Sequence, residues 1–336
     1  MITEGMRRQF HRDGFLIIPN ALEMGDVEIL RREADCLINY LISENINIMT
    51  DYGGIIGITI TIRECADQVP EAPDSVLHIL FEKVPAMVNN FLPEESEDYP
   101  TCLFNEQYIV KTPDSASISS FAWHQDSQYM DTSAKETFPV VSCWIALDNV
   151  NLKNGTLLVE PFPRPKDAKS GGYVELPAQF QERETYVQYH KSVASHYEIP
   201  PADKTAAILM AQNRLPLQPP SPPSAATNTA AGSLSKDPKE WVCESQVPVL
   251  VEVPAGSIVF LSGWVRHCSM GNSSSKFRRA FMPQYSAGKV VTATGGMVSL
   301  AVPCSEYDER ERERVDSRIR MQAEGLDFGD DVDMED

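Results

Sequence analysis

Residues 251–286, "VEVPAGSIVFLSGWVRHCSMGNSSSKFRRAFMPQYS", contain two short runs rich in β-branched and aromatic residues, divided by a segment of Gly, Ser and Asn. Runs of this length and composition, bounded by turn-forming residues, are typical of β-strands. Four similar runs precede them: "NEQYIVK" (105–111), "FPVVSCWIALDNV" (138–150), "GTLLVE" (155–160) and "PVLVEVP" (248–254). The pattern predicts an antiparallel β core, built as a sandwich or a jelly-roll barrel.

Two helical segments are expected before this core. Residues 25–44 carry Val27, Leu30, Ala34, Leu37 and Leu41 at helical spacing, which predicts one amphipathic helix. Residues 76–92, "VLHILFEKVPAMVNNFL", also have a helical pattern, with Pro85 as a break or a boundary between two helices. We therefore expect a mainly β protein with flanking helices, an α+β arrangement.

Composition limits the possible partners and the compartment. The 336 residues are 42% hydrophobic and carry a formal net charge of −19, so a nucleic-acid partner is not expected. Seven dispersed cysteines favour free thiols in a reducing compartment. With no apolar run of membrane-spanning length and no secretory h-region, we expect a cytoplasmic protein that does not enter membranes. The sequence does not indicate an oligomeric state.

Two segments differ in composition from the β core. Residues 200–240 are rich in Pro, Ser, Ala and Thr, which predicts a flexible surface insertion or, alternatively, a lid over the site. Residues 306–336 hold 13 acidic and 5 basic residues, a net charge of −8, and are predicted to be a largely disordered tail. We expect residues 1–305 to form a single domain that contains the insertion.

A candidate metal site begins in "FAWHQDSQY" (121–129), where His124 and Asp126 are two residues apart. In an extended strand both side chains would project from one face, as two ligands of one ion require. A third candidate is His267, which follows the run 256–264 and begins a turn. His11 and His78, in the helical part, are expected to be structural or exposed, and His190 and His196 to be exposed beside the insertion.

Two imidazoles and one carboxylate on one face of an iron ion leave three positions for a cosubstrate and O2. A 2-oxo acid would occupy two of these positions, and its distal carboxylate would need a cation. Arg278 and Arg279 lie in an extended run, so only one of them can face inward. An arginine fits this role because its planar guanidinium binds a carboxylate through two parallel hydrogen bonds.

Four ordered segments resemble the phytanoyl-CoA dioxygenase family of Fe(II)- and 2-oxoglutarate-dependent oxygenases. They are "FHRDGFLIIPNAL" (10–22), "VKTPDSASISSFAWHQDSQYM" (110–130), "LDNVNLKNGTLLVEPFPRP" (147–165) and residues 251–286. The resemblance implies a double-stranded β-helix, a cupin-like jelly-roll barrel with helices outside. It places His124, Asp126 and His267 on the metal-ligand positions, and it gives Fe(II), 2-oxoglutarate and O2 as cofactor and cosubstrates.

The resemblance also implies three cosubstrate contacts. Arg278 falls on the position that pairs with the distal carboxylate of 2-oxoglutarate, Ser269 matches a hydroxyl that binds it, and Thr156 matches a further contact in some relatives. The chain departs from its relatives at Phe121, where several carry Gln, at "EPFPRP" (160–165) and in the insertion. With Phe at this position, the resemblance implies that one cosubstrate contact is missing or is supplied by another residue.

The expected reaction is oxidation of an unactivated C–H bond of a small organic molecule, with release of succinate and CO2. Because Asp126 is present, the resemblance favours hydroxylation, or desaturation and further oxidation on the same scaffold, over halogenation. We expect a fairly apolar natural-product intermediate as the substrate, from secondary metabolism. Alternatives are an acyl-CoA hydroxylase, a non-catalytic cupin-type binding or scaffold protein, and a metal-dependent cupin of other chemistry. Four aromatic residues near the motifs could line the substrate site or belong to the core: Trp123, Tyr129, Trp144 and Trp264.

Overall fold

The structure is a computed structural model that describes residues 2–43, 52–53, 76, 78–96, 99–129, 139–197, 241–288 and 302–304. Its helices are α1 (Glu4–Asp13), α2 (Met24–Ser43), the π-helical η1 (Ile79–Lys83), α5 (Val84–Val88), the 3-10 turn η2 (Asp126–Tyr129) and α6 (Arg183–Ala194). Its strands are β1 (Phe15–Ile18), β2 (Tyr52–Gly53), β3 (Thr101–Lys111), β4 (Phe121–His124), β5 (Val140–Ala146), β6 (Leu157–Glu160), β7 (Arg164–Asp167), β8 (Trp241–Glu244), β9 (Val249–Leu250), β10 (Ile258–Ser262), β11 (Arg266–Ser269), β12 (Arg278–Ala287) and β13 (Val302–Pro303).

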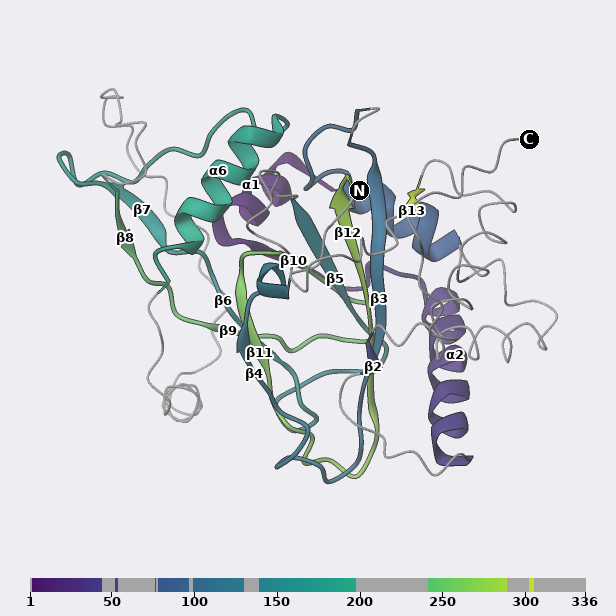
Figure 1. Cartoon of the computed structure of the whole chain (residues 1–336). Coiled ribbons are helices and arrows are strands. Elements are labelled where there is room, and N and C mark those ends of the chain that lie inside the picture. Colours follow the sequence, from purple (N-terminus) through teal and green to yellow (C-terminus); the bar gives the residue numbers. More distant parts are fainter. Residues whose placement is uncertain are drawn as a thin grey trace, which may run out of the picture.

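Two antiparallel sheets form the core (Figure 1). The larger sheet has the order β1-β10-β5-β12-β3-β13, with β2 also paired to β3, and the smaller sheet has the order β4-β11-β6-β9. From β3 to β6 the chain changes sheet at every strand, and it does so again from β9 to β12. This order is that of a double-stranded β-helix, so the predicted jelly-roll fold is confirmed.

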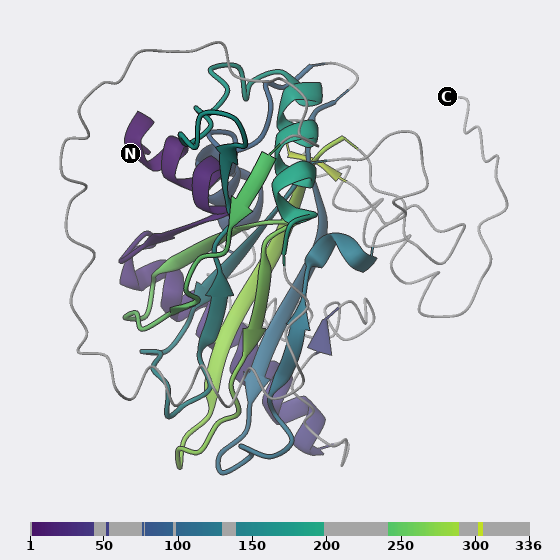
Figure 2. The ribbon, with the colours of Figure 1, turned by 90° about the vertical axis from the view of Figure 1, so that its left-hand side faces the viewer.

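Helices cover the outer face of the larger sheet. Every residue of β5 and β10 is buried, because one face of each strand looks into the barrel and the other lies under helices. α2 begins one residue before the predicted helix and buries Val27, Leu30, Ala34 and Leu37. In the view turned by 90°, α2 lies behind the strands and α6 in front of them (Figure 2).

The helix predicted at residues 76–92 is not a uniform α-helix. The N–H of Val84 donates to the carbonyl of Ile79, five residues earlier, so the segment is a π-helix until α5 begins at Val84. Pro85 has no N–H to donate to the preceding turn, which explains why the helix changes type beside it. The predicted boundary is confirmed at this position.

Several predictions concern segments outside the described residues. The insertion at 200–240 and the tail at 306–336 lie there, as does the side chain of Tyr129, and the single-domain organisation of residues 1–305 stays a prediction.

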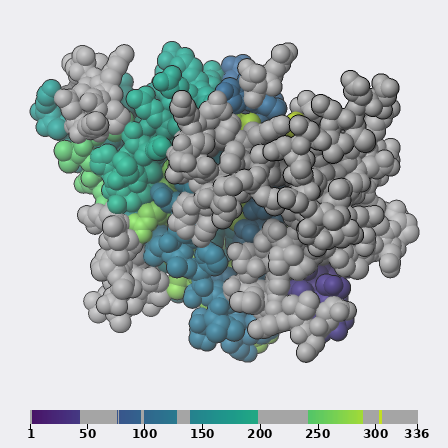
Figure 3. Space-filling view, in the orientation of Figure 1, coloured from purple at the N-terminus to yellow at the C-terminus, as the bar shows by residue number. Residues whose placement is uncertain are grey.

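Within the described ranges, no helix is both long and apolar enough to cross a bilayer. In the space-filling view, the colours of residues 100–130 reach the surface below those of α6 (Figure 3).

Candidate metal centre

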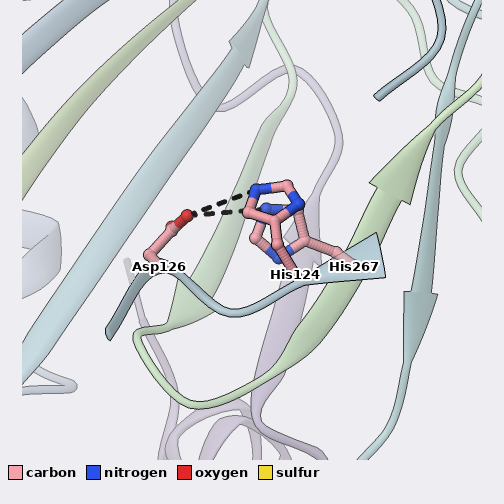
Figure 4. Close-up of side chains that lie close together, drawn as sticks. All are labelled: His124, Asp126 and His267. Atoms are coloured by element: carbon pink, nitrogen blue, oxygen red, sulfur yellow. Dashed lines mark ion pairs between the residues drawn. The ribbon is translucent and has the colours of Figure 1, made fainter. Parts of the chain in front are cut away.

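Three side chains converge between the two sheets (Figure 4). His124, at the end of β4, and His267, on β11, are direct cross-strand partners, and their ring centroids are 4.2 Å apart. The Oδ1 atom of Asp126 lies 3.6 Å from Nε2 of His124 and 3.7 Å from Nε2 of His267. One ligand atom of each residue lies within 4.8 Å of the other two, so one metal ion can be held by all three.

The local structure differs from the extended strand that the H-x-D spacing suggested. β4 ends at His124, and Asp126 begins the 3-10 turn η2. The turn is fixed by two contacts with the chain before β11: the Ser127 N–H donates to the Gly263 carbonyl at 2.8 Å, and Gln125 Nε2 donates to the Trp264 carbonyl at 2.6 Å. His267 lies within β11, not in a turn after a strand as predicted.

Backbone carbonyls orient both imidazoles. Nδ1 of His124 lies 2.9 Å from the Ala122 carbonyl oxygen, and Nδ1 of His267 lies 3.3 Å from that of Val265. A carbonyl oxygen only accepts, so each Nδ1 carries the proton and each Nε2 offers a lone pair towards Asp126. Burial lowers the pKa of His267, although the charge of Asp126 opposes this effect. The neutral form is the one that binds metals.

Arg278 is the most unusual residue near this centre. Its side chain is fully buried, and none of its three guanidinium nitrogens has a hydrogen-bond partner among the described residues. Burial lowers its pKa to about 9. Arg279 faces the other way and pairs with Asp148 and Asp35, so of the two arginines Arg278 faces inward. A buried, unpaired guanidinium is costly unless an anion joins it.

A second buried basic residue, Lys111, was not predicted from the sequence. It is the cross-strand partner of Arg278, and its Nζ donates to Ser269 Oγ at 2.8 Å and to the Met270 carbonyl. Burial, followed by the charge of Arg278, lowers its pKa to about 6. The one sequence feature that could have indicated its burial was its position at the end of the strand-like run "NEQYIVK".

The "NGT" turn closes over this lysine. Gly155 has a φ of +86°, and a Cβ there would lie 2.8 Å from Cδ of Lys111 and 2.7 Å from the Met270 carbonyl oxygen, so glycine is required. The hydroxyl of the next residue, Thr156, donates to the Val251 carbonyl. Its predicted contact with the cosubstrate stays a prediction, as does that of Ser269.

The aromatic residues near the motifs divide between core and site. Trp264 is buried, and Trp123 is half-buried. Trp144 is also buried, with Arg278 5.5 Å from its ring, and its Nε1 has no hydrogen-bond partner among the described side chains and backbone. Trp144 therefore adds a second unpaired buried donor close to Arg278.

A β-bulge brings Phe121 to the side of the metal centre. His267 is opposite His124 and Ser269 is opposite Phe121, so two steps on β11 correspond to three on β4. Phe121 therefore faces the same side as His124 despite the odd spacing, and the two rings meet edge to face at 4.9 Å. Phe121 is 36% exposed, which leaves an apolar surface open beside the metal centre.

The remaining histidines lie away from the site. The expected exposure of His190 was wrong: it is fully buried on α6, bonded to His11 and Ser262 and stacked on Tyr186. α6 turns its buried face to the barrel, a packing that local composition did not reveal. His11 is structural, as expected, and His78 forms an exposed ion pair with Glu82. His196 is half-buried beside the Ser192 carbonyl.

A jelly roll with two histidines and one carboxylate has the ligand set of non-haem Fe(II) oxygenases. The family model of phytanoyl-CoA dioxygenase (PhyH) matches residues 10–280. The chain belongs to this family of Fe(II)- and 2-oxoglutarate-dependent oxygenases, and the expected enzyme class and cofactors are confirmed.

Some solved structures are similar to this chain at low sequence identity. The non-heme alpha ketoglutarate dependent epimerase SnoN from nogalamycin biosynthesis is 13% identical, with a TM-score of 0.46, over 91% of this chain and 96% of that chain. EvdO2 from Micromonospora carbonacea var. aurantiaca, complexed with 2-oxoglutarate, is 16% identical, with a TM-score of 0.47, over 92% and 98%. A comparison with curated proteins found no match.

Proposed function

We propose that this oxygenase hydroxylates an unactivated C–H bond of a small, fairly apolar organic substrate, a natural-product intermediate of secondary metabolism. His124, Asp126 and His267 would hold Fe(II), since their donor atoms already face one another. Bound Fe(II) supplies the redox chemistry, with 2-oxoglutarate and O2 consumed and succinate and CO2 released. The chain's own residues orient the reactants and keep water away.

The observation that carries the proposal is the unpaired Arg278. Two buried basic side chains, Arg278 and Lys111, lie side by side, and of the two only Lys111 has hydrogen-bond partners among the described residues. The distal carboxylate of 2-oxoglutarate would supply the missing anion for Arg278. Lys111 and Ser269 would add donors to the same carboxylate, and Trp144 Nε1 a further one. A non-catalytic binding protein or a cupin of other chemistry has no use for these two basic side chains together with the metal ligands.

Two features support hydroxylation of an apolar substrate. The carboxylate of Asp126 fills the metal position that halogenating relatives leave to chloride. The partly exposed apolar side chain of Phe121, whose ring contacts that of His124, offers contact surface beside the centre. The net charge of −19 disfavours the phosphate groups of an acyl-CoA substrate.

The test is anaerobic absorbance with Fe(II) before and after addition of 2-oxoglutarate. We expect a weak visible charge-transfer band that needs both components. In Arg278→Ala the affinity for 2-oxoglutarate should fall by about 10- to 100-fold while Fe(II) binding is retained, because one charged hydrogen-bond partner contributes about 1.5–3 kcal/mol. Arg279→Ala, its outward-facing neighbour, is the matched control and should bind 2-oxoglutarate as the wild type does.

Unchanged 2-oxoglutarate binding in Arg278→Ala would point to a metal enzyme of other chemistry, and no Fe(II) binding at all would leave a scaffold. The substrate class is tested by succinate formation with small apolar metabolites and with acyl-CoA thioesters offered separately. Stimulation by the thioesters alone would replace the natural-product proposal with acyl-CoA hydroxylation.

A further inference from the structure

A row of three polar side chains crosses the larger sheet and ends on the metal-site carboxylate. Asn105 Nδ2 donates to Gln284 Oε1 at 2.7 Å, and Gln284 Nε2 donates to Ser142 Oγ at 2.7 Å. The Ser142 hydroxyl in turn donates to Oδ2 of Asp126. Asn105, Gln284 and Ser142, which we call the polar row, therefore join β3, β12 and β5 to Asp126.

Strand register builds this row. Gln284 is the direct partner of Asn105 on one side and of Ser142 on the other. Directly opposed residues of antiparallel strands project from the same face, so the three side chains form one line on the barrel-facing side of the sheet. Sequence separations of 179 and 142 residues are bridged in this way.

The direction of every hydrogen bond in the row is fixed. An ionised carboxylate only accepts, so the Ser142 hydroxyl must give its proton to Asp126. That hydroxyl is then free to accept from the amide N–H of Gln284, and the Gln284 carbonyl accepts from Asn105. All three donors therefore point along the row towards the carboxylate.

Burial argues that the row has a function beyond packing. Ser142 is fully buried and Gln284 is 6% exposed, in strands that otherwise consist largely of buried apolar residues. Apolar side chains at these positions would avoid the cost of burying an amide and a hydroxyl. Stability alone therefore does not explain why polar side chains occupy these buried positions.

We infer that the polar row is a positioning device that restricts Asp126 to binding the metal through one oxygen. The row holds Oδ2, while Oδ1 is the atom that faces Nε2 of both histidines. A carboxylate held in this way cannot turn its second oxygen to the metal, so three positions stay open for 2-oxoglutarate and O2. The inference rests on the proposed function, because it assumes that the three ligands bind iron.

The first test is anaerobic titration of the purified protein with Fe(II) and, separately, with Co(II). Loss of a residue that hydrogen-bonds to a metal ligand, without itself touching the metal, typically weakens metal binding by about 10- to 100-fold. We expect a loss of this size in Ser142→Ala and a smaller loss in Gln284→Met, which keeps the side-chain length. The Co(II) absorption spectrum should also change in both variants, because it reports the number of bound ligand atoms.

Ser286→Ala is the matched control. Like Ser142→Ala, it removes a fully buried hydroxyl, but this hydroxyl lies on β12 and donates to the Gly288 carbonyl, outside the polar row. We expect wild-type metal affinity and a wild-type Co(II) spectrum from this variant. Thermal unfolding of all three variants separates a loss of stability from a change at the metal.

The outcomes distinguish this inference from the proposed function. If the wild type binds metal and 2-oxoglutarate but Ser142→Ala and Gln284→Met keep its metal affinity and Co(II) spectrum, the positioning role is overturned and the proposed function stands. If Ser286→Ala shows the same changes as the row variants, the effect is one of packing and the role is again overturned. If the wild type binds neither Fe(II) nor Co(II), the proposed function itself fails.

Discussion

The protein contains two pairs of neighbouring histidines, and only one of them is a candidate metal site. In the first pair, Nδ1 of His11 lies 3.0 Å from Nε2 of His190, whose Nδ1 lies 3.0 Å from Ser262 Oγ. In the second pair, His124 and His267 do not bond to each other and both turn Nε2 towards Asp126. The first pair uses its nitrogens within the core, whereas the second directs them to a shared carboxylate.

A lowered histidine pKa occurs in both pairs and so does not identify the metal site. Burial lowers the pKa of His11 to about 3, and it lowers the pKa of His190 and of His267 as well. What differs is the direction of the ring nitrogens and the presence of a carboxylate between them. A metal site is therefore recognised here by convergent lone pairs and not by perturbed titration.

The largest expected effect comes from removing a ligand of the second pair. His267→Ala should weaken Fe(II) binding by more than about 100-fold. Loss of a residue that only hydrogen-bonds to a metal ligand already weakens binding by about 10- to 100-fold, and loss of the ligand itself should cost more. Anaerobic Fe(II) titration measures this effect. Thermal stability should fall less than in His190→Ala, because the His267 imidazole has one hydrogen bond, to the Val265 carbonyl, whereas that of His190 bonds both His11 and Ser262. Retained Fe(II) affinity would show that the second pair is not the metal site.

The converse variant tests the first pair. His190→Ala leaves a cavity and removes the partner of both His11 and Ser262, so unfolding should become easier by about 2–4 kcal/mol. Denaturant unfolding gives the change, and Fe(II) titration at a temperature where the variant is folded should give wild-type affinity. A loss of metal affinity with unchanged stability would reverse the roles assigned to the two pairs.

Mild acid should act on the first pair through the unfolded state. Both imidazoles have a folded-state pKa below the unfolded value of about 6.5, so below that pH the unfolded chain takes up protons that the folded chain does not. Stability should fall with pH by an amount approaching about 1.4 kcal/mol per unit for each imidazole. Unfolding curves of the metal-free protein between pH 6.5 and 5, compared with His11→Gln, measure this; identical slopes would exclude the first pair as the cause.

His78 belongs to neither pair and serves as the control for the effect of removing a histidine. It lies on the surface with an ion pair to Glu82 at 3.0 Å, and its side chain is 46% exposed. His78→Ala should change stability by less than about 0.5 kcal/mol and leave metal affinity unaltered. The same unfolding and titration experiments apply, and a larger change would mean that histidine loss by itself perturbs the protein.

Local spacing was sufficient to predict part of the site from the sequence. The segments around His124, Asp126 and His267 lie in the expected order, and the structure brings their side chains together. The alternation of an extended run correctly limited the inward arginine to one of Arg278 and Arg279. The short β-like runs with turn residues between them predicted a sandwich or a jelly-roll barrel, and the family resemblance selected the jelly-roll barrel.

Register across the sheet could not be predicted in this way. Lys111 and the polar row matter through partners more than 140 residues away, and no spacing rule in one sequence specifies such pairing. The signal that existed was a polar residue within an apolar strand run, as at Ser142 in "FPVVSCWIALDNV". The burial of His190 was missed for the same reason, since it depends on which face α6 turns to the barrel.

The extra residue in β4 separates the position that holds a metal ligand, His124, from the position that forms the surface beside it, Phe121. His124 and Phe121 face the same side, but they belong to different registers of the strand, with the bulge between them. A change at residue 121 therefore alters the apolar surface beside the reactive centre and leaves the pairing of His124 with His267 in place. The bulge thus makes the size and polarity of the side chain at residue 121 independent of the strand pairing that holds the two histidines together.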